Sequence, residues 1–267
     1  MKALITGASS GIGRDMARIL SDMGYDLILV ARRKSRLEEL KVALPTNVTI
    51  IPMDISSTYN CMKLYEKVKD EDIEIVINNA GFGLYGEFSK TKIDTELDMI
   101  DLNVETTHTL TKLFLKDFKK KDRGYILNVA SSAAFMPGPM MATYYATKAY
   151  VLRLTEAIDY ELKIDNSNVY VGALCPGPIK TEFEKVANVE FTIKKFESGE
   201  VAEYAIKKMF QRKNIIVPGF MMKFSRFVSK ILPDTFLAKL AYNSQKRKKW
   251  YDRSNKKLYF IYYYWQW

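Results

Sequence analysis

The 267-residue sequence has few of the side chains that build disulfide frameworks and metal sites. It holds two cysteines, Cys61 and Cys175, and a single histidine, His108. The cysteine spacing matches neither a metal site nor a disulfide pattern, so we expect no metal and a reducing, cytoplasmic setting. No run is long and apolar enough to span a bilayer. Met1-Lys2 leads directly into an apolar run, and we expect no signal peptide.

No internal repeat or low-complexity linker divides the chain, and strand and helix patterns alternate over residues 1–217. Apolar runs predict about seven strands, at residues 3–5, 26–31, 48–53, 73–77, 125–130, 169–174 and 215–217. Helices are expected at 14–24, 35–44, 57–68, 94–118 with a bend near Asn103, 144–162 and 200–212. The proline-containing loop 133–143 is expected to hold no helix. The alternation predicts an α/β fold, a doubly wound parallel sheet with helices on both faces.

A glycine-rich turn, Thr6 to Gly13, joins the first strand to the first helix. Gly7, Gly11 and Gly13 let the turn close and let backbone N–H groups approach a diphosphate, at which the positive end of the helix points. Their spacing, G-x-x-x-G-x-G, differs from the commoner dinucleotide fingerprint. Taken alone, the turn is also compatible with a tight connection that binds nothing.

Two arginines, Arg32 and Arg33, follow the second strand, where an NAD-binding fold places an acidic side chain on the adenosine ribose. A guanidinium binds a 2′-phosphate bidentately, whereas a carboxylate would repel it. We therefore predict NADP(H) rather than NAD(H), with Arg32 preferred and Ser10 as an added hydroxyl donor. The alternative is that the arginines begin the solvent face of the next helix. Asp54, after the third strand, could accept from the adenine amino group or cap a helix.

Polar or glycine-containing segments follow the predicted strand ends along the chain. They are the turn at 6–13, Asp54, residues 78–81, Ser131-Ser132 and residues 176–181. In parallel sheets, ligands bind beyond the carboxyl ends of the strands. We therefore expect these segments to converge on one crevice.

Together the motifs resemble, in order and spacing over residues 1–217, those of the short-chain dehydrogenase/reductase family, in an NADP-preferring bacterial branch. They are Thr6-Gly7-x3-Gly11-x-Gly13, Asn78-Asn79-Ala80-Gly81, Asn103, Ser131, Tyr144-x3-Lys148 and Pro176-Gly177. The resemblance implies a Rossmann-type fold, a nicotinamide cofactor and interconversion of alcohols and carbonyls. It also implies cofactor contacts from Ser9, Ile12, Asn79, Ala80, Gly81, Pro176 and Gly177.

The chemistry of Tyr144 and Lys148 supports the same interpretation. The two residues are four apart in a predicted helix and so share one face. An ammonium favours the phenolate, so we predict that Lys148 lowers the pKa of Tyr144 from its usual value near 10. Tyr144 would then act as general acid or base, and Ser131 would donate a hydrogen bond to the substrate oxygen.

The resemblance gives further roles to neighbouring residues. It implies that Lys148 binds the nicotinamide ribose and that Asn103 holds a water in a proton relay to this lysine. Ser131 is preferred over Ser132 because it precedes Tyr144 by the family's usual thirteen residues. Tyr145 is expected to pack or to form a pocket wall. Thr181 either contacts the carboxamide or diphosphate, or caps a helix.

The C-terminal end is strongly basic. Residues 207–267 hold fifteen Lys and Arg against two acids, within a net charge of +10 for the chain. We predict a helical extension at 218–243 and a basic, aromatic tail at 244–267. One helical face carries Phe220, Phe224, Phe227, Val228 and Ile231. This stripe could pack over the pocket or in a dimer, as such segments often do in the family, or lie on an anionic membrane. No recognition motif for nucleic acid accompanies the charge.

The leading hypothesis is an NADP(H)-dependent oxidoreductase for a hydrophobic ketone or secondary alcohol, with a hydroxysteroid or another lipid favoured. Large, soft side chains are candidates for the pocket wall: Phe82, Leu84, Phe135, Met136, Met140, Met141 and Phe183. Two other classes stay open, a non-catalytic NADP-binding sensor and a membrane-surface scaffold on the same fold. Peripheral membrane contact and a homo-oligomer are expected for the leading class.

Overall fold

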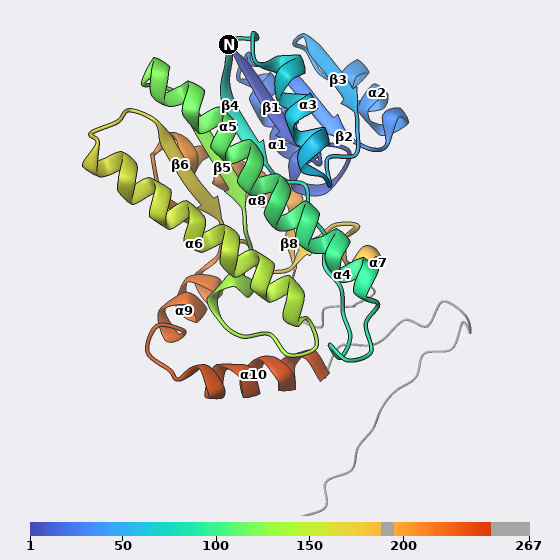
Figure 1. Cartoon of the computed structure of the whole chain (residues 1–267), viewed down its shortest axis with the longest axis vertical. Helices are drawn as coiled ribbons and strands as arrows, with labels where there is room; N and C mark the ends of the chain where they lie inside the picture. The colour runs from blue at the N-terminus through green and yellow to red at the C-terminus, as the bar shows by residue number, and fades with distance from the viewer. Residues whose placement is uncertain (188–194, 247–267) are drawn as a thin grey trace, which may run out of the picture.

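The computed structural model describes residues 1–187 and 195–246, and a parallel sheet crosses its centre (Figure 1). Its strands run in the order β3-β2-β1-β4-β5-β6-β9. They are β1 (Lys2–Thr6), β2 (Asp26–Ala31), β3 (Val48–Pro52), β4 (Ile73–Asn78), β5 (Tyr125–Val129), β6 (Tyr170–Leu174) and β9 (Ile215–Ile216). All neighbours pair in parallel. The strand order reverses between β1 and β4, which is where open α/β sheets bind ligands.

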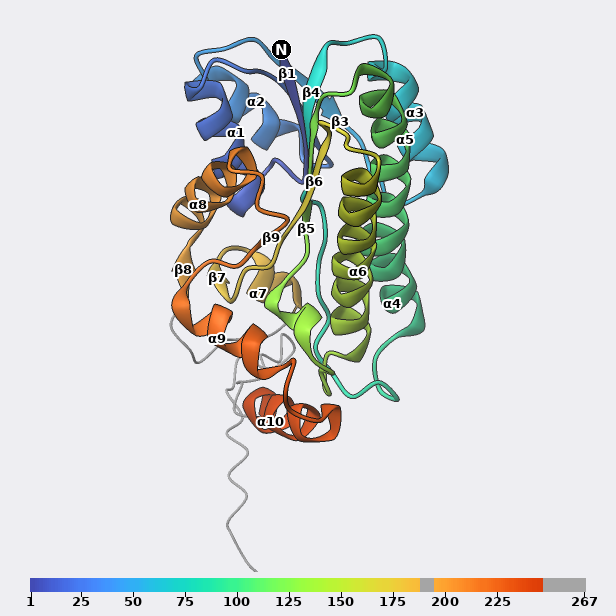
Figure 2. The ribbon, with the colours of Figure 1, turned by 90° about the vertical axis from the view of Figure 1, so that its left-hand side faces the viewer.

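Helices cover both faces of this sheet, as Figure 2 shows. One face carries α1 (Gly11–Asp22), α2 (Lys34–Ala43) and α8 (Ser198–Phe210). The other carries α3 (Thr58–Val68), α5 (Thr106–Lys121) and α6 (Ala142–Ile164). Strand side chains alternate between two apolar cores, so that Leu4 and Val76 pack on one face and Ile5 and Ile77 on the other. The predicted doubly wound, Rossmann-type fold is confirmed.

The helix expected at 94–118 is interrupted where its sequence pattern weakens. Helix α4 (Ile93–Ile100) passes through a π-helical turn, Asp101–Glu105, into α5. The backbone N–H of Thr106 donates to the carbonyl of Asp101, five residues back. This turn contains Asn103, so an irregularity of the helix lies at the residue where a bend was predicted. Such π turns are frequent at functional sites.

Several short elements differ from the predictions. Residues 133–143 were expected to hold no helix, yet a 3-10 helix spans Ser132–Phe135, with Ser131 as its cap. A helical turn of this length forms before the prolines begin. Asp54 does not cap α3, because Ser57 accepts the hydrogen bond from Asn60 N instead. The elements β7 (Ile179–Lys180), α7 (Phe183–Ala187) and β8 (Phe196–Glu197) were not predicted.

The C-terminal helices close the molecule at the carboxyl ends of the strands. They are α9 (Phe220–Val228) and α10 (Asp234–Lys246), drawn in orange and red at the bottom of Figures 1 and 2. Helix α10 continues three residues past the predicted boundary at 243. The rest of the predicted basic, aromatic tail lies outside the described residues. Within residues 1–187 and 195–246, no helix has the length and apolar character needed to cross a bilayer.

Candidate active site

A cavity of about 900 Å³ lies at the carboxyl ends of the strands. Its wall includes the loops after β1, β2, β3, β4, β5 and β6, together with α9 and α10. The predicted convergence of these loops on one crevice is therefore observed. Of the predicted site residues, these line the cavity: Gly7, Ser9, Ser10, Gly11, Ile12, Arg32, Arg33, Asp54, Asn79, Ala80, Gly81, Ser131, Tyr144, Lys148, Pro176, Gly177 and Thr181. Gly13 and Asn103 lie behind its wall.

The glycine turn presents the start of α1 to this cavity. Gly7 and Gly11 have positive φ angles of 65° and 56°, which favour glycine. Ser10 precedes α1 without a side-chain cap bond, and no acidic residue stands in the first turn. The helix therefore offers backbone N–H groups and its positive end to an anion. This arrangement fits the diphosphate of a dinucleotide.

Gly13 contributes by close packing and not by lining the cavity. A Cβ atom there would lie 2.4 Å from the side-chain nitrogen of Asn79. That nitrogen donates to the carbonyl oxygens of Thr6 and Gly7, at 3.0 and 3.2 Å. The turn after β1 is thus fastened to the loop after β4, and this contact requires glycine at position 13.

Arg32 and Arg33 both lie at the end of the cavity where β2 stops. They differ in how exposed their side chains are and in the partners that they bind. The side chain of Arg32 is 74% exposed and approaches Asp54 at 3.8 Å. Arg33 donates to the hydroxyl of Ser9 at 3.1 Å and pairs with Glu182 at 2.8 Å. Bonding to Arg33 lowers the pKa of the Glu182 carboxyl. Glu182 was not predicted, since its pairing joins residues far apart in the chain.

Thr181 has a position compatible with either role that the sequence left open, and its contact with the cofactor stays a prediction. It lines the cavity, and its hydroxyl accepts a hydrogen bond from Phe183 N at 3.2 Å, as a cap of α7 would. Thr181 also explains why position 11 of the turn is a glycine. A Cβ atom on Gly11 would lie 3.0 Å from the methyl group of Thr181.

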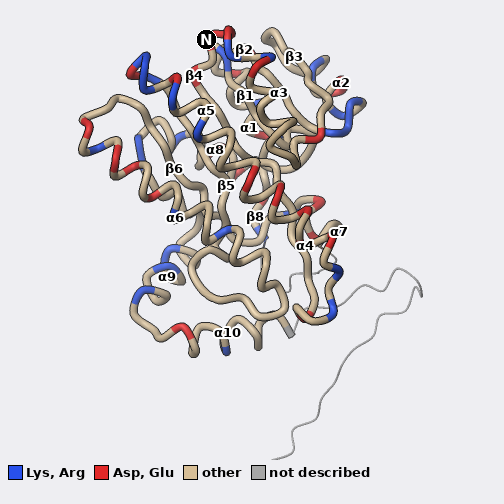
Figure 3. The backbone as a smooth tube through the Cα atoms, viewed as in Figure 1, with Lys and Arg blue, Asp and Glu red and all other residues tan. Residues whose placement is uncertain are grey.

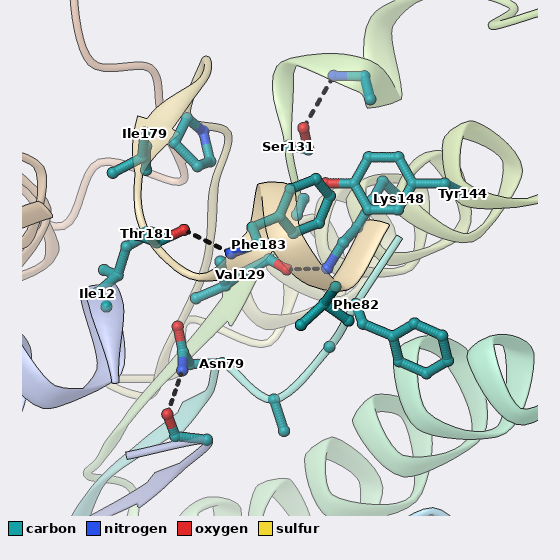
Figure 4. A pocket seen from close by; sticks show the side chains of 18 of the residues that line it. Ile12, Asn79, Phe82, Val129, Ser131, Tyr144, Lys148, Ile179, Thr181 and Phe183 are labelled. Carbon is teal, nitrogen blue, oxygen red and sulfur yellow. Dashed lines mark hydrogen bonds between the residues drawn. The ribbon is translucent and has the colours of Figure 1, made fainter. Parts of the chain in front are cut away.

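Tyr144, Lys148 and Ser131 meet on one side of the cavity, as Figure 4 shows. Helix α6 carries Tyr144 and Lys148, while Ser131 stands just after β5. Lys148 Nζ donates to the carbonyl of Val129 at 2.9 Å and lies 6.0 Å from the centre of the Tyr144 ring. Ser131 Oγ accepts from Ala133 N at 3.1 Å, and its hydroxyl also forms a hydrogen bond with the Tyr144 phenol.

Burial, and not the neighbouring charge, controls the acidity of this pair. It raises the pKa of the Tyr144 phenol to about 12, while the Ser131 hydroxyl acts in the opposite direction. Burial also lowers the pKa of the Lys148 ammonium to about 8. The expectation that Lys148 lowers the pKa of Tyr144 is wrong for this arrangement, because desolvation of the phenol dominates. The phenol is held as a proton donor.

Asn103 is buried in the π turn with both ends of its amide engaged. Its oxygen accepts from Phe82 N at 3.0 Å, and its nitrogen donates to Phe82 O at 2.9 Å and Thr147 Oγ1 at 3.1 Å. A Cβ atom on Gly81 would lie 2.7 Å from that oxygen. The side chain therefore holds the loop after β4 beside Tyr144 and Lys148.

Many apolar side chains also line the cavity. Of the large side chains predicted there, Phe82, Met136, Met141 and Phe183 line it. Leu84, Phe135 and Met140 do not line it. Phe135 instead packs under the Arg226 guanidinium, 5.9 Å from its ring centre. The sequence did not reveal the contributions of Val186, Met222, Leu237, Leu240 and Ala241.

The apolar stripe expected on the C-terminal extension does not form a buried face. Phe220, Phe224, Phe227 and Ile231 are exposed, and only Val228 of the stripe lines the cavity. Helix α9 lines the cavity through Met222 and Ser225, which lie outside the stripe, and through Val228 of the stripe. The extension therefore does fold over the pocket, but its most apolar face is turned outward.

Comparisons with known proteins agree with this geometry. Residues 1–190 match the family model described as short chain dehydrogenase. A 7beta-hydroxysteroid dehydrogenase of Clostridium sardiniense is 33% identical over 178 residues, covering 65% of this chain and 67% of that protein. A short-chain dehydrogenase from Sphingobium yanoikuyae in complex with NADPH has a TM-score of 0.77 and 28% identity, over 87% of this chain and 96% of that one. One from Burkholderia phymatum in complex with NAD shares the fold at a TM-score of 0.75 and 22% identity, over 84% and 91% of the two chains.

Proposed function

The chain belongs to the short-chain dehydrogenase family, and on this premise we propose that it is an NADP(H)-dependent oxidoreductase that interconverts a ketone and a secondary alcohol. The observation that carries the proposal is the placement of Tyr144, Lys148 and Ser131 in one cavity with the glycine turn. Residues 1–217 would form the cofactor-binding and catalytic domain, and the extension from 218 would cover the substrate.

In ketone reduction, a nicotinamide cofactor held by the glycine turn would supply the hydride for the carbonyl carbon. The residues of this chain then stabilise and neutralise the negative charge that develops on the substrate oxygen. Ser131 donates a hydrogen bond to that oxygen, and Tyr144 gives it a proton. A phenol with a raised pKa remains protonated at neutral pH and so suits the role of acid. Lys148, fixed by Val129 O, places a positive charge beside the phenol as it loses its proton. Asn103 keeps the loop at Phe82 in position.

The choice of NADP(H) rests on the two guanidiniums at the adenosine end of the cavity. Arg32 is exposed there, and Arg33 is already oriented by Ser9 and Glu182. A 2′-phosphate placed between them would gain charge-assisted hydrogen bonds. The NADPH complex of the Sphingobium relative supports this choice, while the Burkholderia neighbour is a complex with NAD.

The substrate that we propose is large and apolar, a hydroxysteroid or another lipid. The cavity volume of about 900 Å³ and its methionine, phenylalanine and leucine wall suit such a ligand. The similarity to a 7beta-hydroxysteroid dehydrogenase points to the same class. We propose a cytoplasmic homo-oligomer that also contacts membranes, because the outer side of α9 is apolar and exposed.

The direct test follows NADPH oxidation across a panel of bulky apolar ketones. We expect Tyr144→Phe to lower kcat/KM by about 10²- to 10⁴-fold, since only the proton donor is removed. Tyr150→Phe is the matched control, because Tyr150 lies on the same helix and binds His108 outside the cavity. Binding of NADPH without turnover of any ketone would favour the sensor or scaffold alternatives. Undiminished turnover in Tyr144→Phe would exclude the proposed mechanism.

A further inference from the structure

Helix α10 lines the cavity with one face. Leu237, Ala241 and Gln245 follow one another at intervals of four and so lie along a single stripe of the helix. All three are buried and line the cavity. Two of them are apolar, as expected for a wall that meets a hydrophobic ligand. Gln245 is the exception, and its side chain is only 2% exposed.

Gln245 is held in place by two tyrosines from distant parts of the chain. Its side-chain nitrogen donates to the hydroxyl of Tyr145 at 2.9 Å. Its backbone carbonyl accepts from the hydroxyl of Tyr85 at 3.2 Å. The Tyr145 ring in turn packs edge-on against the ring of Tyr144, with centroids 6.2 Å apart. The Gln245 amide therefore contacts Tyr145, and Tyr145 contacts the proposed acid Tyr144.

The amide oxygen of Gln245 finds no hydrogen-bond partner among the residues that the structure describes. A buried acceptor without a partner is costly, and a leucine or methionine would fill this position in an apolar wall without that cost. The hydrogen bond that fastens α10 to Tyr145 uses only the side-chain nitrogen of Gln245. The oxygen end is therefore suited to a donor that a ligand brings into the cavity.

We propose that Gln245 binds a hydroxyl group of the substrate, at a point removed from the carbonyl that Tyr144 protonates. The proposal rests on the proposed function and narrows its substrate class from an apolar ketone to a hydroxylated one. The substrate hydroxyl donates to the Gln245 oxygen, while the rest of the molecule contacts Leu237, Ala241 and Met141. Gln245 thereby acts in binding and selection of the substrate and takes no part in the reaction.

The test compares matched bicyclic ketones, 2-decalones that carry a hydroxyl, a methoxy group or hydrogen at each position of the second ring. Their affinities are measured by calorimetry with the full chain and saturating NADP+, so that no turnover is needed. We expect one hydroxyl isomer to bind about tenfold more tightly than the parent ketone. Its methoxy analogue should show no such gain, because an ether has no proton to donate to the amide oxygen.

Three variants assign the effect to this side chain. Gln245→Met should abolish the preference for the hydroxyl isomer, and Gln245→Glu should keep it, because a carboxylate retains the acceptor. Gln211→Met, on the exposed end of α8, is the matched control and should retain the preference. Equal binding of the three ketones, a preference that survives in Gln245→Met, or an equal gain from the methoxy group would overturn the proposal. These outcomes concern affinity alone, whereas the proposed function is tested by turnover and fails if no ketone is turned over or if turnover survives in Tyr144→Phe.

Discussion

At the scale of single residues, burial sets the protonation of the catalytic pair. It raises the pKa of Tyr144 to about 12 and lowers that of Lys148 to about 8. The phenol therefore carries its proton across the working range. The lysine loses its charge as the pH rises through about 8, and with it the stabilisation of the developing phenolate.

The pKa values of Tyr144 and Lys148 predict how the rate of ketone reduction depends on pH. We expect kcat/KM to be level below about pH 8 and to fall above it by up to tenfold per pH unit, as Lys148 becomes neutral. Alcohol oxidation should instead rise with pH, because Tyr144 must first lose its proton. The measurement is kcat/KM in both directions with the cofactor saturating. A reduction profile that stays level up to about pH 10 would remove Lys148 from the mechanism.

The adenosine end of the cavity allows a second prediction at this scale. Arg32 is more exposed and less engaged than Arg33, and so is more available to a phosphate. We expect Arg32→Ala to raise KM for NADPH by about 10- to 100-fold, the effect of a charge-assisted hydrogen bond, with little change for NADH. Arg36→Ala, which alters an exposed pair with Glu39, is the control. Equal losses for NADPH and NADH would contradict a role in binding the 2′-phosphate.

At the scale of elements, the π turn between α4 and α5 supports the loop that faces the catalytic pair. Asn103→Leu removes three hydrogen bonds and leaves the Phe82 N–H and carbonyl without their partner. We expect a loss of about 2 kcal/mol in the free energy of unfolding, together with a lower kcat. Urea denaturation and steady-state kinetics measure the two effects.

The conservative variant separates these two effects. Asn103→Asp keeps the acceptor for Phe82 N and loses the two bonds that the side-chain nitrogen donates. It should fall between the wild type and Asn103→Leu in both measurements. A stable Asn103→Leu protein with unchanged kcat would mean that the loop does not depend on this side chain.

At the scale of the whole molecule, the helix α9 that lines the cavity also carries an exposed apolar and cationic surface. Phe220, Met221, Phe224, Phe227 and Ile231 are exposed on and after α9. Lysine and arginine accompany them, as the blue segments on α9 in Figure 3 show. Such a surface suits an anionic bilayer, and an apolar substrate could then enter from the lipid.

Flotation with liposomes tests this arrangement. We expect the full chain to float with anionic vesicles and less with neutral ones, and replacement of Phe220, Phe224 and Phe227 by serine to weaken binding by at least about tenfold. A version that ends at Lys246 tests the contribution of the tail without shortening α10. Turnover of a water-soluble ketone should be unaffected by the triple replacement. Equal, weak flotation of all proteins, with a dimer that the triple variant dissociates, would assign this surface to subunit contact instead.

Local patterns in the sequence were enough to determine the doubly wound sheet and the grouping of its loops. The strands at 26–31 and 73–77 are apolar except for Asp26 and Glu74, because both of their faces are covered, and this pattern is readable within each segment alone. The spacing of Tyr144 and Lys148 places them on one helical face whatever surrounds the helix. The glycines of the first turn are required by backbone geometry, which is equally local.

Only the tertiary structure decided the properties that depend on what each residue meets. Desolvation raised the pKa of Tyr144 where the neighbouring lysine alone predicted the opposite direction. Most of the apolar stripe of α9 was turned outward, while Met222, Ser225 and Val228 of the same helix line the cavity. Gln245 is held in the pocket wall by a hydrogen bond to Tyr145, which lies one hundred residues earlier in the chain. Burial and long-range pairing are products of packing, and no periodicity within a single segment encodes them.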